Sequence, residues 1–472
     1  MSEYKATIGI EVHVEVKSNT KLFSNSKNTY GMPTNTCVNP VDLGYPGTLP
    51  TLNKEVIRQG IKACNVLHCD ISKVMHFDRK NYFYPDIPKN YQITQNRTPI
   101  GRNGYIEIEV DGQKKKIEIE EMHIEEDTCK SAHRGEISLL DFNRAGVPLI
   151  EIVTKPCISS SEEAMKYLEK LKETLFYANI SDCKMEEGSM RCDANVSISK
   201  TDTLGVKTEI KNIGSIHNVG LSIDKEIARH KELLEKGETL QVETRRFDSK
   251  KNDTVLMRVK ETGNDYRYFP EPDIPYLYLA DEMIEKAIKE IPLLPDELRS
   301  LYKEKGIKES QIEKLISNRS FSSFFTELIK EDTDYKIAAN LLLGDIASYL
   351  NRTRKDLGDT TITVKRLVSL IAHLSDGSLS MNNIKDLIDT FLETDKSVEE
   401  IMKEKNIQNI KDDSLIKDII ARVIANNEES VNDYKSGHDR ALKYLMGQMM
   451  KESKGQVNPS LANKLLQEEL EK

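Results

Sequence analysis

The first residues that could carry chemistry lie near the N-terminus, in the segment IGIEVHVEV. Glu11, His13 and Glu15 alternate there with aliphatic residues, and this period of two predicts a strand with one polar and one apolar face. Burying two carboxylates beside an imidazole is costly without a ligand. The polar face therefore fits either a solvent-facing strand or a cation site, in which oxygen donors favour Mg²⁺ or Mn²⁺ and the imidazole suits Mn²⁺ or Zn²⁺.

A second acidic segment, EEMHIEEDTCK, follows a predicted hairpin. If the strand continues, Glu126 shares a face with Met122 and Ile124, and we expect it to be partly buried. A buried carboxylate needs a cation, a metal ion or a hydrogen-bond donor. The alternative is an exposed acidic loop.

A third segment, MEEGSMRCDANVS, combines a flexible turn with a strand. Arg191 could bind a phosphate group with two parallel hydrogen bonds, or form a structural salt bridge with a neighbouring glutamate. Asp193 and Asn195 project together from the strand and could bind a cation.

Basic and aromatic residues interleave in FDRKNYFYPDIPKNYQITQ, which contains Arg79, Lys80 and Lys89. Such a segment can bind phosphate and stack on bases, although aromatic residues near prolines also serve in packing. The segment TEIKNIGS offers Glu209, Lys211 and Asn212 at the end of a strand. Since the sequence contains no P-loop, GxGxxG, GxSxG or HExxH motif, the residues alone indicate a metal-dependent enzyme acting on a phosphate-bearing substrate.

Composition sets the class of the molecule. The chain has 472 residues and a formal net charge of −9, so any contact with RNA must come from a local basic surface. Seven cysteines without a CxxC pair suit a reducing compartment. The sequence shows no signal peptide and no apolar run approaching the roughly 18–20 residues that span a bilayer. We therefore expect a cytoplasmic protein without a membrane partner.

The elements that position these residues are predicted to be of the α+β class. A hairpin is expected around Asp111-Gly112, and RCDANVSI reads as a strand. One helix is expected to begin near Ser159 or Ser160, and another to run from about Ser222 to Lys236. We expect a mixed catalytic domain over residues 1–290, a helical domain over 291–405 and a helical tail over 406–472, with a break near Pro292 and Pro295.

Eight segments resemble, in order and spacing, the motifs of the GatB family. They are IGIEVHVEV, GYPGTLPTLN, FDRKNYFYPDIPKNYQITQ, HIEEDTCK, DFNRAGVPLIEIVTKP, MEEGSMRCDANVS, TEIKNIGS and DYRYFPEPDIP. The C-terminal GHDRALKYLMGQMMKESKGQVNP resembles that family's tail domain. The resemblance spans almost the whole chain.

The resemblance implies a cradle-shaped catalytic domain followed by helical middle and tail domains. It implies a ligase that amidates Glu-tRNA(Gln), Asp-tRNA(Asn) or both, using ATP and Mg²⁺ or Mn²⁺ through an acyl phosphate. It also implies partners: the amidase (A) subunit, which releases ammonia from glutamine, the small C subunit, and the misacylated tRNA.

Carried over by position, the resemblance implies a metal-binding set of Glu11, His13 and Glu126, with Glu125 as a further candidate. Catalytic or ammonia-path roles are implied for Lys80, Tyr82 and Asp193. Residues implied at the nucleotide pocket are Arg191, Glu209, Lys211, Asn212 and Arg267. Many relatives have a Cys-Pro-x-Cys segment of a zinc site where this chain reads Asn39-Pro40-Val41-Asp42, so we expect no structural zinc.

Contact with tRNA is expected from the tail. At helical spacing a basic stripe, or else an ordinary solvated helix face, would be formed by Arg440, Lys443, Lys451 and Lys454. Two rival functions use the same residues: a metal-dependent phosphohydrolase or nuclease, and a non-catalytic scaffold that presents tRNA to a partner enzyme.

Overall fold

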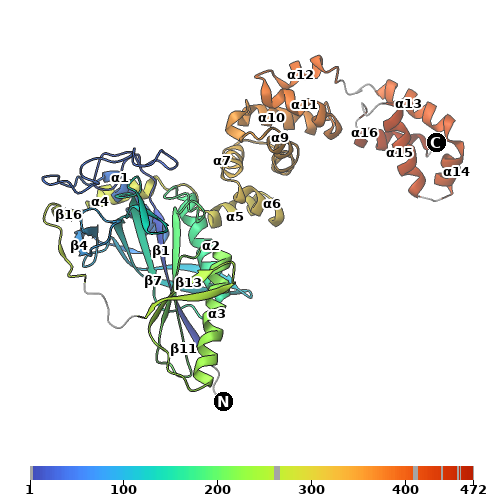
Figure 1. The fold of residues 1–472 in the computed structure, drawn as a ribbon. Helices are drawn as coiled ribbons and strands as arrows, with labels where there is room; N and C mark the ends of the chain where they lie inside the picture. Colours follow the sequence, from blue (N-terminus) through green and yellow to red (C-terminus); the bar gives the residue numbers. More distant parts are fainter. Residues whose placement is uncertain are drawn as a thin grey trace. The chain divides into compact units, whose positions relative to one another are not determined.

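The computed structural model describes residues 4–259, 266–407, 413–436, 439–453, 457 and 459–470. The chain divides into two compact units, Met1–Leu294 and Pro295–Lys472. The first unit combines sheets and helices and the second is helical (Figure 1), which confirms the α+β class. The finer division near residue 405 stays a prediction.

The first unit is built on a sheet that has nine strands within the described residues, in the order β14-β13-β12-β11-β1-β10-β7-β6-β2. Neighbouring strands are antiparallel except β12 and β13. The strands are β1 (Lys5–Glu15), β2 (Asp70–Ile71), β6 (Gly101–Val110), β7 (Gln113–Glu126), β10 (Pro148–Thr154), β11 (Met190–Ser199), β12 (Thr208–Lys211), β13 (Glu243–Asp248) and β14 (Asp253–Val259). The N-terminal strand thus lies in the interior of the sheet.

Smaller sheets accompany the large one. A three-stranded sheet has the order β15-β4-β5, and two pairs are formed by β16 with β3 and by β8 with β9. Their bounds are β3 (Val74–Met75), β4 (Asp78–Asn81), β5 (Tyr91–Thr94), β8 (Lys130–Arg134), β9 (Ile137–Asp141), β15 (Phe269–Pro270) and β16 (Leu277–Tyr278).

Helices cover the apolar face of the large sheet. They are α1 (Lys54–Val66), α2 (Ser161–Tyr177) and α3 (Ile216–Glu235), and α2 and α3 run along the sheet in Figure 1. The helix α4 (Asp281–Lys289) packs against α1. Ser160 caps α2 by accepting a hydrogen bond from the Glu163 N–H, as the sequence predicts. The expected start of α3 near Ser222 is wrong, because Ser215 caps the helix and it begins at Ile216.

The alternation in β1 decides which face is buried. Ile8, Ile10, Val12 and Val14 are fully buried in the core, and the intervening side chains form part of the opposite, polar face. His13 pairs with Glu151 of β10 and with Arg191 of β11, and Glu151 pairs with His123 of β7. Side chains directly opposite each other in a sheet lie close together, so this register gathers ionisable groups from four strands on one face.

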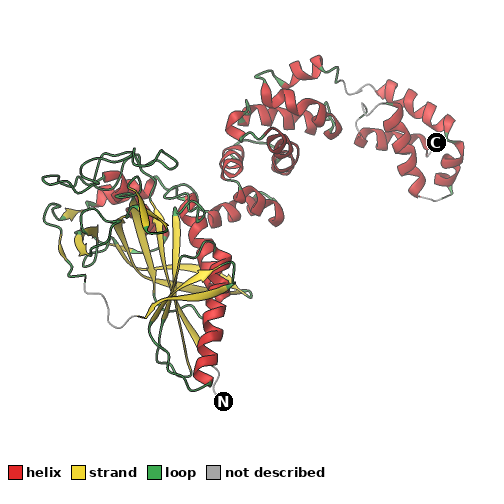
Figure 2. Cartoon of the chain, viewed as in Figure 1, coloured by secondary structure: helices red, strands yellow, loops and turns green. Residues whose placement is uncertain are grey.

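The second unit consists of helices, drawn in red in Figure 2. They are α5 (Pro295–Glu304), α6 (Glu309–Ser317), α7 (Arg319–Leu328), α8 (Tyr335–Leu341), η1 (Leu342–Ile346), α9 (Ala347–Thr353), η2 (Leu357–Asp359), α10 (Val364–Ser375), α11 (Met381–Glu393), α12 (Val398–Glu404), α13 (Asp413–Asn426), α14 (Glu428–Lys435), α15 (Asp439–Glu452) and α16 (Pro459–Leu470). The last four share a hydrophobic core that includes Ile420, Leu445 and Leu466. Across the described residues, every helix is too short or too polar to span a bilayer.

Candidate functional site

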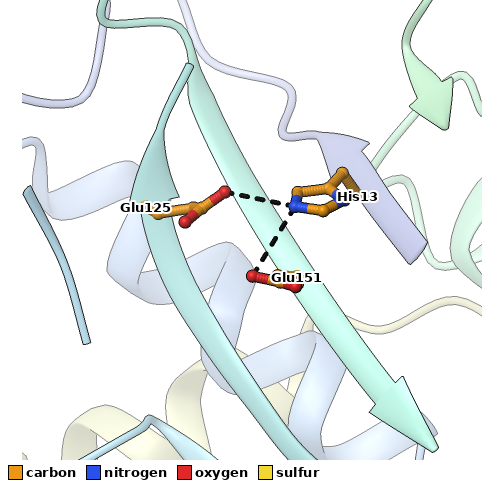
Figure 3. Close-up of side chains that lie close together, drawn as sticks. All are labelled: His13, Glu125 and Glu151. Carbon is orange, nitrogen blue, oxygen red and sulfur yellow. Dashed lines mark ion pairs between the residues drawn. The ribbon is translucent and has the colours of Figure 1, made fainter. Parts of the chain in front are cut away.

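A first candidate metal centre is formed by His13, Glu125 and Glu151, which come from β1, β7 and β10 and converge on one point (Figure 3). His13 Nε2 lies 3.4 Å from Glu125 Oε1 and 3.5 Å from Glu151 Oε2. The three ligand atoms lie within 4.8 Å of one another. Two carboxylates and an imidazole form a donor set that fits Mn²⁺ and, with water ligands, Mg²⁺.

The charges in this first centre stabilise one another. Burial disfavours the imidazolium form of His13, but Glu151 and Glu125 outweigh it and hold the pKa of His13 well above its ordinary value. Burial likewise opposes ionisation of Glu151, yet His13 and His123 hold the pKa of Glu151 well below the usual range. His123 Nε2 lies 2.7 Å from Glu151 Oε2 and fixes the orientation of that carboxylate. The centre therefore presents ionised carboxylates to a cation, and His13 must release its proton before its Nε2 can bind that cation.

A second acidic group, Glu11, Asp193 and Glu209, occupies neighbouring positions on β1, β11 and β12, again with ligand atoms within 4.8 Å. Asn195 donates a hydrogen bond to Glu11 Oε1 (2.8 Å), and Lys211 pairs with both Asp193 and Glu209. Burial, followed by the nearby charge of Glu151, raises the pKa of Glu11. These three carboxylates form a second donor set suited to a hard divalent cation.

A cavity of about 530 Å³ connects the two groups. His13 and Glu125 line it from the first and Asp193 from the second, and Lys80, Arg191 and Lys211 also line it. Carboxylates that can hold a cation thus face basic side chains that can neutralise phosphate oxygens. The cavity can therefore accommodate a phosphorylated substrate together with a divalent ion.

The structure also places the other predicted pocket residues. Arg191 pairs with Asp127 (2.6 Å) rather than with a neighbouring glutamate, and Asn212 lines the cavity with a backbone φ of 60°. Tyr82 follows β4, and burial raises its pKa. Arg267, with φ of 47°, lies just before β15, and its carbonyl accepts a hydrogen bond from the side chain of Asn81.

The expected position of Glu126 facing Glu11 and His13 is wrong. Successive residues on a strand point to opposite faces, and Glu126 shares the apolar face with Ile124, where Lys89 pairs with it and the Ile93 N–H donates to it (2.9 Å). Its expected burial is confirmed. Glu125 occupies the polar face instead.

Glu151 and His123 belong to this site but are not among the residues that the sequence predicts for it. Glu151 is the one charged residue in the strand PLIEIVT, where every other side chain is apolar apart from the terminal threonine. A lone charge in such a strand is a signal of a buried functional group. His123 offers a weaker signal, since its partner becomes known only from strand pairing.

The segment Asn39-Pro40-Val41-Asp42, in which we expect no zinc site, is held in place by hydrogen bonds to the carboxylate of Asp42. Its carboxylate accepts hydrogen bonds from Ser24 and Ser26 (2.6 Å each) and from the Asn39 N–H (3.0 Å). The fully buried ammonium of Lys21 lies 3.3 Å from it. These neutral and charged donors satisfy the carboxylate, while the absence of zinc stays a prediction.

The tail places Arg440, Lys443 and Lys451 on α15, and all three are exposed. Their spacing brings them to one side of the helix. Lys454 lies outside the described residues. Contact of this surface with tRNA stays a prediction.

Comparison with known proteins identifies the family. The GatB/GatE catalytic domain model matches residues 6–285, and a GatB domain model matches residues 323–470. The B subunits of the aspartyl/glutamyl-tRNA(Asn/Gln) amidotransferases of Geobacillus kaustophilus and Geobacillus thermodenitrificans are each 47% identical to this chain, over 99% of both chains. The corresponding B subunit of Lysinibacillus sphaericus is 46% identical, again over 99% of both chains. Matches that cover nearly the entire length leave one conclusion: this chain belongs to the GatB family of amidotransferase B subunits.

Proposed function

We propose that this chain amidates glutamate or aspartate misacylated on tRNA, using ATP and ammonia. The observation that carries the proposal is the pairing of two carboxylate groups with basic side chains around one cavity. The names of the relatives supply the substrate class.

The reaction needs activation because a carboxylate is a poor acyl donor. Transfer of the terminal phosphoryl group of ATP to the carboxylate forms an acyl phosphate and releases ADP. Ammonia then attacks the carbonyl carbon, the C–O bond to phosphate breaks, and the amide and inorganic phosphate leave. Phosphoryl transfer depends mainly on positioning and on neutralising charge.

The residues of the site divide this work. His13, Glu125 and Glu151 would hold one divalent ion and Glu11, Asp193 and Glu209 a second, and a bound ion would neutralise the oxygens of the transferring phosphoryl group. His123 and Asn195 orient the carboxylates of Glu151 and Glu11.

The basic groups bind the substrates. Lys80 and Lys211 line the cavity as ammonium donors. Arg191 is preoriented by its salt bridge to Asp127. A planar guanidinium held in this way can donate two parallel hydrogen bonds to a phosphate group without losing further side-chain freedom.

Ammonia must reach the cavity unprotonated and protected from water, so the proposal includes two partner proteins, an amidase that hydrolyses glutamine and the small C subunit. Lys80 and Tyr82 are the candidates for the ammonia path, because Glu126 lies on the opposite face of β7. The misacylated tRNA would contact the exposed basic residues of α15.

One assay separates this proposal from its rivals. Purified chain is mixed with Glu-tRNA(Gln), ATP, Mg²⁺ and ammonium chloride, and the products are resolved by charge and size. Formation of Gln-tRNA with release of ADP supports the proposal. Cleaved RNA, or ATP hydrolysis that is independent of tRNA, would instead identify a nuclease or a phosphohydrolase. Binding of tRNA without chemistry, even after both partner proteins are added, would identify a scaffold.

A further inference from the structure

Three tyrosines cluster beside the cavity and have no role as aromatic surfaces in the chemistry above. Tyr82 and Tyr266 lie 6.1 Å apart between ring centroids, and Tyr266 and Tyr268 lie 6.0 Å apart, both in edge-to-face arrangements. Lys80 Nζ lies 4.9 Å from the centroid of Tyr266. All three rings are partly exposed. We call these three residues the tyrosine cluster.

The backbone holds the tyrosine cluster in place. The N–H and the side chain of Asn81 both donate hydrogen bonds to the Tyr266 carbonyl, and the Asn81 side chain also donates to the Arg267 carbonyl. Arg267 has a left-handed backbone, which is costly for a side-chain-bearing residue and persists where the surroundings impose it. Phe269 then pairs with Arg79 of β4. The rings are therefore fixed to the same short sheet that carries Lys80.

The cavity lacks what a nucleobase needs. Among the described residues that line it, the apolar side chains are Leu149, Cys192 and Ile213, and the rest of the lining is mostly charged or polar. Such a lining suits phosphates and carboxylates but offers no flat apolar surface. Each ring of the tyrosine cluster offers a flat face of this kind. Lys80 lies beside the Tyr266 ring and also lines the cavity.

We propose that the tyrosine cluster is the base-stacking platform for an adenosine whose phosphates or acyl group enter the cavity. Adenosine is common to both substrates of the proposed function, on which this inference rests: it is the nucleoside of ATP and the 3′-terminal nucleoside of tRNA. Stacking on aromatic rings tolerates either source, and loss of a stacking ring typically weakens binding about tenfold to a hundredfold.

The test compares two substitutions at one position in the amidotransferase assembled with its partner proteins. Tyr266→Leu removes the ring and Tyr266→Phe keeps it. We expect Tyr266→Leu to raise one KM about tenfold or more, and Tyr266→Phe to stay within about threefold of wild type. A rise in the KM for ATP assigns the platform to the adenine of ATP, and a rise in the KM for Glu-tRNA(Gln) assigns it to the 3′-terminal adenosine. Unchanged KM values for both substrates, or equal losses in the two variants, would overturn the proposal.

A binding measurement decides the matter if the leucine variant fails to assemble. The chain contains no tryptophan, so Tyr266→Trp places a single tryptophan, which can be excited selectively, in the full chain. Saturable quenching by ATP, or by an RNA minihelix ending in a 3′ adenosine, supports stacking, and an unchanged signal with both overturns it. This titration needs no catalysis. Failure of wild type to form Gln-tRNA would therefore count against the proposed function, while the titration would still judge the platform.

Discussion

Glu151 is the residue at which the first metal centre can be tested most directly. Its carboxylate lies 2.7 Å from His123 Nε2 and 3.5 Å from His13 Nε2. At an effective dielectric constant of about 20, these separations correspond to roughly 6 and 5 kcal/mol of attraction with each imidazolium, before the cost of desolvation. Glu151→Gln keeps the shape of the side chain and removes this charge.

The expected effects on stability and on activity differ in size. Both imidazoles can lose their protons once the carboxylate is neutral, so we expect the free energy of unfolding at pH 7.5 to fall by only about 1–3 kcal/mol. Loss of a proton from an imidazole cannot replace a missing metal ligand. The rate of amidation by Glu151→Gln should therefore fall by about 10²–10³, or roughly 3–4 kcal/mol of transition-state stabilisation.

The assay measures the initial rate of Gln-tRNA formation with ammonium chloride as the nitrogen donor, so that glutamine hydrolysis does not contribute. Glu120→Gln is the matched control, because Glu120 lies on β7 but is exposed. Binding of Mn²⁺, followed by electron paramagnetic resonance, gives a readout that is independent of turnover. Amidation within about threefold of wild type, with unchanged Mn²⁺ binding, would refute the assignment of Glu151 to the centre.

Four further predictions concern other parts of the chain. Burial of His230 lowers its pKa from 6.5 to about 4, so below pH 6.5 the unfolded chain binds this proton more readily than the folded chain. The free energy of unfolding of wild type should therefore fall by up to about 3 kcal/mol between pH 6.5 and pH 4, and His230→Asn should remove this fall. Parallel pH profiles of the two proteins would contradict this. Asp42→Asn should leave the ammonium of Lys21 buried without its carboxylate and lower the free energy of unfolding in urea by about 3 kcal/mol. Mass spectrometry of the wild-type chain should find no stoichiometric zinc. A zinc content of one ion per chain would contradict the expectation that this chain has no structural zinc site. Replacing the basic residues of α15 by glutamate should raise the KM for tRNA without changing the KM for ATP. The slope of the logarithm of the tRNA binding constant against the logarithm of salt concentration should become shallower by about 0.7–0.9 per lost phosphate contact. An equal rise in both KM values would argue against the tail as an RNA surface. The three replaced residues are Arg440, Lys443 and Lys451.

Local sequence patterns predict the structure well where a single strand or helix determines which side chains are buried or which residue forms the cap. The alternation from Ile8 to Val16 needs only the period of a β-strand, and it correctly places Glu11 and His13 on the polar face. The capping serine of α2 is likewise a signal within four residues of sequence. These features could be predicted because their physical cause is local.

Features that depend on partners distant in sequence could not be predicted in this way. The consecutive carboxylates Glu125 and Glu126 point to opposite faces, and their sequence does not say which face holds the candidate metal centre. Glu126 is buried as expected, but its partners Lys89 and Ile93 belong to β5 and the loop before it. Similarly, Glu151 joins His13 only through the register between β1 and β10. Strand order and register, rather than composition, determine the membership of the site.

The interior position of β1 also constrains how the protein is made. Ile10 forms a hydrogen bond with Thr154 across 144 residues, and Asn195 reaches Glu11 across 184 residues. At a synthesis rate of about 5–20 residues per second, the first strand leaves the ribosome roughly 10 to 40 s before its last partner. During that interval an unpaired strand of buried aliphatic residues is prone to aggregate, and the charges of Glu11, His13 and Glu15 oppose such association. Glu11 and His13, which belong to the two candidate metal centres, are thus also expected to reduce aggregation of the nascent chain until the sheet closes around β1.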